Sequence, residues 1–299
     1  MLLSRRAMLA APIVMSAAKT LTAASRMTLA IHQNTSAAAG YRKSLEGWAR
    51  AGIKNVEITS TLLDDFLKSD SLAAAKRVLT DNGLTPVSCA VGVNGLWEPN
   101  PNHAAALDDL KRRCEMFGTL GLTKFYAPVT PTTPFKEEDY KVGVEHMRAV
   151  GDIAGQFNMT GMAEFTRAST FVATLGTALT MKRAAAHASF KLLFDCYHFW
   201  SGQSKFEDLD RLEPGDVGHV HFQDVPDTPR ELLGQATRVI PGDGVTPLVK
   251  ILRKLSDKGY AGPLSVELFL PKFQQGDPYD VAAEIKRKAE AVMRSARVL

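Results

Sequence analysis

The sequence predicts a single α/β domain, a (β/α)8 TIM barrel over residues 27–299. Short apolar or β-branched runs alternate with longer helical patterns eight times, which is typical of βα units and a parallel sheet. No Pro/Gly/Ser-rich linker interrupts residues 27–299, and the 45% hydrophobic content suits a chain with a large core. A doubly wound open sheet would carry a glycine-rich phosphate turn after its first strand. HQNTSAAAG at that point holds one glycine, at its end, so the barrel is favoured.

The elements follow in order along the chain. The predicted strands are residues 27–32, 55–58, 85–91, 123–128, 159–164, 190–195, 218–222 and 263–269. The predicted helices are residues 41–51, 71–82, 103–120, 138–156, 170–187 and 279–297, and a further helix in TPLVKILRKL. Thr246 opens that last helix as a capping hydroxyl ahead of Pro247, and Asn82-Gly83 ends the second one.

The first 25 residues have the organisation of a bacterial export signal. Two arginines precede an apolar stretch and then small residues at which a signal peptidase could cut. Ser4-Arg5-Arg6 followed by Met8-Leu9 resembles the twin-arginine signal, with Met8 where that pattern usually has Phe. The apolar stretch is shorter than the ~20 residues that a membrane span needs. We therefore expect no membrane span, and a periplasmic or secreted protein; the amphipathic N-terminal helix is the alternative.

Charge and cysteine content limit the classes of partner. The formal charge is +4, but without Arg5, Arg6 and Lys19 there are 33 basic and 32 acidic residues. A nearly neutral chain lacks the positive field that duplex binding requires, so no nucleic-acid partner is expected. The three cysteines have no close spacing that would indicate a disulfide framework or a CxxC site. Self-association into a homo-oligomer stays open.

Four residues of ligand type close four successive strands. Glu164 ends the fifth run, Asp195 the sixth, His221 lies at the end of the seventh and Glu267 near the end of the eighth. A carboxylate that ends a strand is often a helix cap or an ion-pair partner. Three buried carboxylates at one barrel mouth would repel one another unless a cation neutralised them. Three carboxylates and one imidazole suit one divalent cation, Mn²⁺, Mg²⁺ or Co²⁺, with positions left open for substrate oxygens.

The same residues carry a family resemblance. EFTRAST, FDCYHFW with its DxxH spacing, HVHFQD, RVIPGDG and SVELF resemble, in that order, the xylose isomerase-like sugar phosphate isomerase/epimerase superfamily. The resemblance implies that Glu164, Asp195, His221 and Glu267 bind one cation, and that Glu164 and Glu267 are the catalytic acid/base pair. It also implies that His198 and Arg238 contact substrate, although the long segment after His221 leaves open whether Arg230 or Arg238 does so.

Further candidates for the pocket are His32 and Glu57, which end the first and second runs. Either they line the pocket as substrate contacts or they are structural. PGDG, residues 241–244, reads as a turn, because it lacks the glycine-lysine pattern of a phosphate cradle.

The sequence thus predicts a metal-dependent isomerase or epimerase that abstracts a proton next to a metal-bound carbonyl through an enediolate. Its expected partner is a small carbohydrate or keto-sugar. A lyase or dehydratase of keto-sugars or cyclic keto-polyols begins with the same proton abstraction and is the alternative. Two further classes are disfavoured. A non-catalytic sugar binder gives no reason for two glutamates to converge on a cation. An apurinic endonuclease needs histidines at the ends of the third and fourth strands, where this chain has Val91-Gly92 and Tyr126-Ala127-Pro128.

Overall fold

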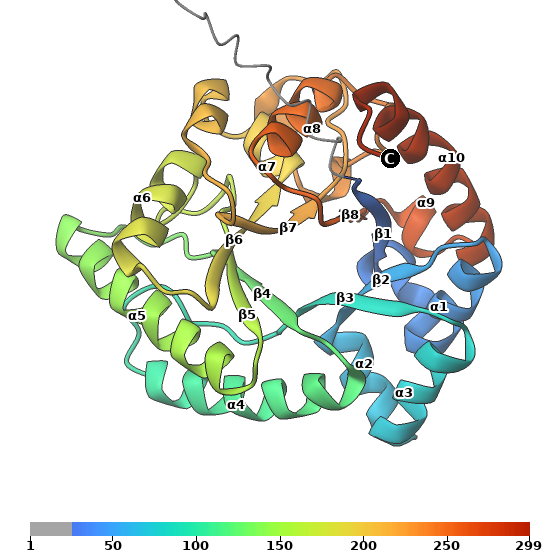
Figure 1. The fold of residues 1–299 in the computed structure, drawn as a ribbon, viewed down its shortest axis with the longest axis horizontal. Helices are drawn as coiled ribbons and strands as arrows, with labels where there is room; N and C mark the ends of the chain where they lie inside the picture. The colour runs from blue at the N-terminus through green and yellow to red at the C-terminus, as the bar shows by residue number, and fades with distance from the viewer. Residues whose placement is uncertain (1–25) are drawn as a thin grey trace, which may run out of the picture.

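The structure, a computed structural model, describes residues 26–299, and the predicted export signal in residues 1–25 lies outside the described residues. Eight parallel strands pair in chain order and β1 pairs with β8, so the sheet closes into a barrel. Figure 1 looks along the barrel and shows the helices around the ring of strands. The strands are β1 (Thr28–His32), β2 (Asn55–Thr59), β3 (Thr85–Ala90), β4 (Lys124–Pro128), β5 (Thr160–Glu164), β6 (Phe190–Asp195), β7 (Val217–His221) and β8 (Pro263–Val266). The predicted TIM barrel is confirmed.

The α-helices lie mostly between successive strands. They are α1 (Gly40–Arg50), α2 (Ser60–Leu67), α3 (Leu72–Asp81), α4 (His103–Leu120), α5 (Glu137–Gln156), α6 (Leu175–Ala185), α7 (Cys196–Ser201), α8 (Leu248–Asp257), α9 (Pro271–Gln274) and α10 (Pro278–Ala296). Short 3-10 helices are η1 (Gln33–Ala39), η2 (Phe206–Arg211), η3 (Arg230–Leu232) and η4 (Gln235–Thr237).

Two predicted boundaries differ from the structure by three residues or more. The helix expected over 170–187 begins at Leu175, because the hydroxyl of Thr174 accepts a hydrogen bond from the Thr177 amide and caps it there. The last strand ends at Val266, so Glu267 follows the strand directly. The short helices α2 and α7 were not predicted; each starts directly after a strand whose last residue caps it, Thr59 and Asp195 respectively.

The first and last helices complete the ring. Figure 1 shows α1 beside α10, with the C-terminus near β1. A Cβ on Gly47 would lie 2.7 Å from Cβ of Pro278, so the glycine permits this close approach. The Met27 amide also donates to the Val298 carbonyl, at 2.5 Å. These contacts close the outer ring of helices and join the two ends of the described chain.

Side chains fill the barrel interior in layers, because alternate residues of each strand point inward. Tyr126, Met162 and Leu193, from β4, β5 and β6, form a buried cluster there. Two residues further toward the carboxyl ends of β5 and β6, the inward positions are Glu164 and Asp195. Two residues toward the amino ends of β4 and β6, they are Lys124 and Lys191. Along β4, β5 and β6, ionisable residues therefore lie on both sides of this apolar cluster.

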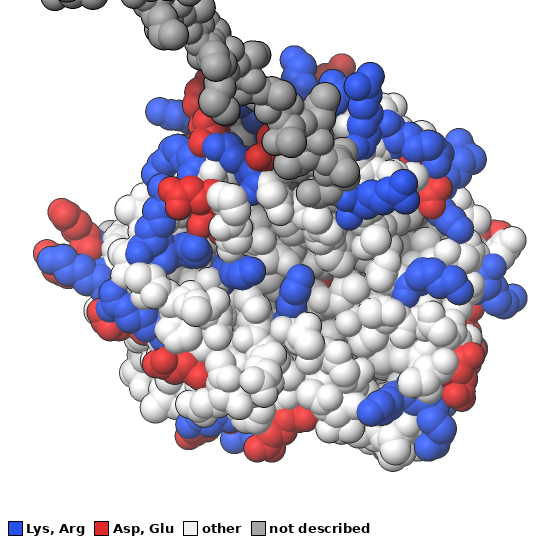
Figure 2. All heavy atoms as spheres, viewed as in Figure 1, with Lys and Arg blue, Asp and Glu red and all other residues white. Residues whose placement is uncertain are grey.

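The outer surface carries both signs of charge. Figure 2 shows basic and acidic side chains interspersed around the rim of one face, with mostly uncharged residues at its centre. Within residues 26–299, no helix is both long and apolar enough to cross a membrane.

Candidate metal centre and active site

The four predicted metal ligands converge at the carboxyl end of the barrel. Glu164, Asp195 and His221 are the last residues of β5, β6 and β7, and Glu267 follows β8. One ligand atom from each lies within 4.8 Å of the others, and all four side chains are buried. Parallel strands bring their carboxyl ends to one mouth, which is why residues separated by about 25 to 50 positions meet here.

The imidazole of His221 is the centre of the cluster. Its Nδ1 atom forms a hydrogen bond with Glu164 Oε1 at 3.0 Å and lies 3.4 Å from both Asp195 Oδ2 and Glu267 Oε2. One imidazole nitrogen thus faces three carboxylates. That is an oxygen-rich donor set of the kind that divalent cations take.

Burial and mutual repulsion shape the protonation of the carboxylates. Burial raises the pKa of Glu164 to about 8. The neighbouring Asp195 and Glu267 also raise this pKa, whereas His221 lowers it. Burial also opposes ionisation of Asp195, but Arg238, His198 and His221 hold the pKa of Asp195 well below its usual range. For His221, burial is outweighed by Glu267, Glu57 and Glu164, so its pKa is raised. The carboxylates need positive charge at their centre, and a cation fits that requirement.

Arg238 supplies part of this positive charge. Its Nη1 atom donates to Asp195 Oδ2 at 3.0 Å and to Glu267 Oε2 at 2.5 Å, and the side chain is almost wholly buried. Arg230, the alternative, lies over the ring of Trp200 and donates to the Gly202 carbonyl. Of the two arginines that the sequence left open, Arg238 is the one that lies at the cluster and lines the cavity.

His198 lies next to Arg238, on α7. Arg238 Nη2 lies 3.0 Å from His198 Nε2, and the Arg167 amide lies 3.2 Å from His198 Nδ1, so both ring nitrogens face donors and a neutral imidazole can accept from only one of them. Burial lowers the pKa of His198 to about 4, so the imidazole is neutral. The helix that carries it begins on Asp195, whose Oδ1 accepts from the His198 amide at 2.7 Å. One aspartate thus both joins the cluster and positions the histidine.

Glu57 and His32 do not lie where the substrate-contact prediction requires. Both are fully buried, and neither lines the cavity at the barrel mouth. Glu57 Oε2 is 3.0 Å from His219 Nε2 and 3.2 Å from His221 Nε2, on the side of that ring away from the cluster. His32 lies 3.5 Å from Glu267 and 3.1 Å from the Tyr126 hydroxyl. Of the two alternatives that the sequence left open, pocket lining and a structural role, the positions of these two residues behind the cluster agree with the structural one.

Three residues of the site were not singled out from the sequence. Tyr126 contacts His32, His219 pairs with Glu57, and Gln223 donates to Asp195 Oδ2 at 2.7 Å. Strand alternation could have indicated His219, two positions before His221 in HVHFQD, and Tyr126, two positions before the end of β4. Gln223 lies beyond the strand, where no periodicity applies.

A cavity of about 420 Å³ opens onto the cluster. Glu164, His198, Arg238 and Glu267 line its base, and Val93, Tyr197, Leu233 and Phe269 are among the apolar residues of its walls. The segment after β7 covers part of the mouth of this cavity. Arg167 holds the segment by donating to the carbonyls of Arg230 and Leu233. The Tyr197 hydroxyl donates to the Gly234 carbonyl of the same segment.

This barrel and site belong to a known class of protein. Residues 45–294 match the family model described as xylose isomerase-like TIM barrel, and the chain belongs to that family.

Its relatives include proteins named inosose isomerase and D-psicose 3-epimerase. An inosose isomerase of Halalkalibacterium halodurans is 27% identical over 237 residues, 78% of this chain and 84% of the relative. A D-psicose 3-epimerase of Ruminiclostridium cellulolyticum is 24% identical over 78% of this chain and 79% of its own length. Among solved structures, IolI protein with a bound zinc atom superposes with a TM-score of 0.83 at 24% identity, covering 90% of this chain and 99% of that one.

Proposed function

We propose that this chain is a divalent-metal-dependent isomerase or epimerase of sugars or keto-polyols that moves a proton at a carbon next to a carbonyl. The observation that carries the proposal is the convergence of Glu164 and Glu267, together with Asp195 and His221, at the base of one cavity. A catalytic carboxylate pair and a cation site in the same cavity are what such a proton transfer needs. The activities named for the relatives agree with this reaction class.

Glu164, Asp195, His221 and Glu267 would hold the cation. When bound, a divalent cation supplies Lewis-acid polarisation of a substrate carbonyl. The oxygen-rich set favours Mn²⁺, Mg²⁺ or Co²⁺, and the zinc in the IolI structure is a further candidate. Metal analysis of purified protein tests this assignment, because one divalent ion per chain is expected, and none or three would contradict it.

Glu164 and Glu267 have different proton affinities in this cluster. Burial raises the pKa of Glu164, whereas the pKa of Glu267 is lowered because His221, Arg238 and His32 outweigh burial. A pair of carboxyls with separated pKa values can divide the roles of acid and base. Glu267 is then the base in one direction, with Glu164 as its proton-carrying counterpart, and the roles exchange in the reverse reaction.

The substrate we propose is uncharged. Among the described residues that line the cavity, the arginines are Arg167 and Arg238. Arg238 is paired with Asp195 and Glu267, and Arg167 directs both terminal nitrogens to backbone carbonyls. No lining cation is left for a phosphate, and the carboxylates at the base would repel one. Hydroxyls can instead meet His198 and Arg238, while C–H faces pack on Tyr197 and Phe269.

The experiment is incubation of metal-loaded protein with keto-inositols and ketohexoses in deuterated water, followed by NMR. Solvent deuterium in an intact isomer supports the proposal, whereas loss of water from the substrate would identify the alternative, a lyase. Phosphorylated ketohexoses serve as the matched controls, and their preferential turnover would contradict an uncharged substrate. Phe165→Leu, a substitution of a fully buried residue that does not line the cavity, is the control for general disturbance of the fold.

We further propose that residues 1–25 export the protein to the periplasm or beyond. The support is the order of arginine pair, apolar stretch and small residues in the sequence. Mass spectrometry of material exported by a bacterial host checks this, because an intact Met1 terminus would contradict cleavage. Undiminished export of Arg5→Lys/Arg6→Lys would contradict the twin-arginine route.

A further inference from the structure

A second cavity, of about 190 Å³, lies at the opposite end of the barrel from the carboxylate cluster. Lys124 is the first residue of β4, Lys191 the second residue of β6, and Gly218 the second residue of β7, so the cavity lies at the amino ends of these strands. Asp195 is four residues beyond Lys191 on the same strand, about 13 Å along it at ~3.3 Å per residue. The two sites are therefore separate.

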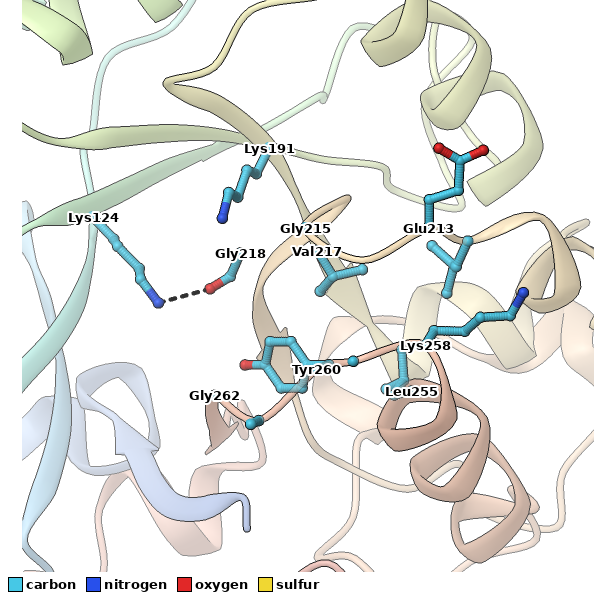
Figure 3. Close-up of a pocket in the computed structure, with 13 residues that line it drawn as sticks. Lys124, Lys191, Glu213, Gly215, Val217, Gly218, Leu255, Lys258, Tyr260 and Gly262 are labelled. Carbon is cyan, nitrogen blue, oxygen red and sulfur yellow. Dashed lines mark hydrogen bonds between the residues drawn. The ribbon is translucent and has the colours of Figure 1, made fainter. Parts of the chain in front are cut away.

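Two ammonium groups face this second cavity. Figure 3 shows the side chains of Lys124 and Lys191 pointing toward the same space beside Gly218. Lys124 Nζ donates to the Gly218 carbonyl at 3.0 Å, across the barrel from β4 to β7. A Cβ on Gly218 would lie 3.2 Å from Cβ of Lys191, so the glycine leaves room for the lysine stem to pass.

These ammonium groups have no carboxylate partner among the described residues within 4 Å. The nearby acids are committed elsewhere: Asp216 pairs with Lys182 and Arg183, and Glu213 also faces Arg183. In Figure 3 the Glu213 carboxylate and the Lys258 ammonium point away from the two lysines. Lys258 donates to the Asp210 carbonyl, at 2.5 Å.

The arrangement is costly without a bound anion. Lys124 is half-buried, and its pKa is lowered first by burial and then by the charge of Lys191. Two like charges at this end of the barrel oppose each other, and neither has a carboxylate partner to offset the repulsion. An anion would offset both the repulsion and the loss of hydration.

We propose that this cavity binds a small oxyanion of the phosphate class between Lys124 and Lys191. The cavity exceeds the ~30 Å³ share of one water several times, which leaves room for a tetrahedral anion with part of its hydration shell. Free inorganic phosphate and the phosphate group of a monoester share this chemistry, and the half-open floor admits either one.

The test is the thermal midpoint of the metal-loaded chain in inorganic phosphate, compared with chloride at equal ionic strength. Phosphate should raise the midpoint of the wild type, because a ligand that binds only the folded state stabilises it. Lys191→Met should abolish the rise. Lys258→Met, a rim lysine that points away, should keep it. Without phosphate, Lys191→Met should melt higher than the wild type, because the repulsion is gone.

The result that would overturn the proposal is a wild-type rise no greater than in chloride, or an equal rise in Lys191→Met. The same measurement with glucose 6-phosphate distinguishes the two sources of the anion. A larger rise in the thermal midpoint than with inorganic phosphate assigns the site to a phosphate monoester, and a smaller rise assigns it to the free ion. Phosphate bound at the metal centre is recognised because it would persist in Lys191→Met. This inference is independent of the reaction proposed above.

Discussion

Glu57→Gln tests whether the residue behind His221 tunes the metal centre. The side chain is fully buried, and its Oε2 atom lies 3.0 Å from His219 Nε2 and 3.2 Å from His221 Nε2. Because Nδ1 of His221 faces the carboxylates, a carboxylate at Nε2 fixes the tautomer and increases the basicity of Nδ1. The glutamine keeps the volume and a hydrogen-bonding oxygen but removes the charge.

The magnitude follows from that difference. Hydrogen bonds to charged groups contribute about 1.5–3 kcal/mol, and neutral ones about 0.5–1.5 kcal/mol. Loss of the Glu57 charge should therefore weaken metal binding by about 1–1.5 kcal/mol, or roughly tenfold in metal affinity. This lies at the lower end of the 10–100-fold typical of residues that hydrogen-bond to a metal ligand.

The assay is a calorimetric Mn²⁺ titration of metal-stripped protein, with circular dichroism to confirm the fold. Glu213→Gln, a carboxylate removed at the other end of the barrel, is the matched control and should bind metal as the wild type does. An unchanged dissociation constant in folded Glu57→Gln would refute the reasoning, and so would an equal loss in the control.

Three other predictions concern catalysis, stability and reactivity. Glu164→Gln and Glu267→Gln should each retain metal yet exchange substrate protons with solvent about 10²–10⁴-fold more slowly, as measured by NMR on a confirmed substrate. Near wild-type exchange in both variants would make the acid/base assignment wrong. Burial raises the pKa of Asp216, but the Lys182 hydrogen bond and neighbouring groups outweigh burial, so the pKa is lowered overall. The contribution of Asp216 to folding stability is therefore fully present above the unfolded pKa of about 3.9, and it is lost as the pH falls through the lower folded pKa. Asp216→Asn should accordingly cost about 1–3 kcal/mol in urea unfolding at pH 7, with a difference from wild type that shrinks below pH 4, whereas a pH-independent difference would exclude the ion pair as its source. Burial raises the pKa of Cys114 to about 12, and all three cysteines are buried, so a maleimide should label none of them in the native protein and all three after denaturation. Rapid native labelling would contradict this burial.

Much of the fold could be predicted because local patterns and chain topology agree. The strands predicted to end at Glu164 and Asp195 end at these residues in the structure, because a buried parallel strand has a nearly continuous apolar sequence. The barrel then follows from eight such units. The order of these runs also predicted which side chains share the mouth, because every strand of a parallel barrel ends on the same side.

The tertiary structure decided how those side chains divide their roles. His32 ends β1 just as Glu164 ends β5, and Glu57 lies two residues before the end of β2. Both nevertheless lie behind the cluster, because the depth of an inward-pointing side chain depends on barrel tilt and register. Only the fold of the segment after β7 distinguishes Arg238 from Arg230. The facing of Lys124 and Lys191 likewise depends on strands that are not neighbours in the sheet. The sequence alone determined the residue types, their periodicity and their order, which are local properties of the chain; distances across the barrel arise only when it closes.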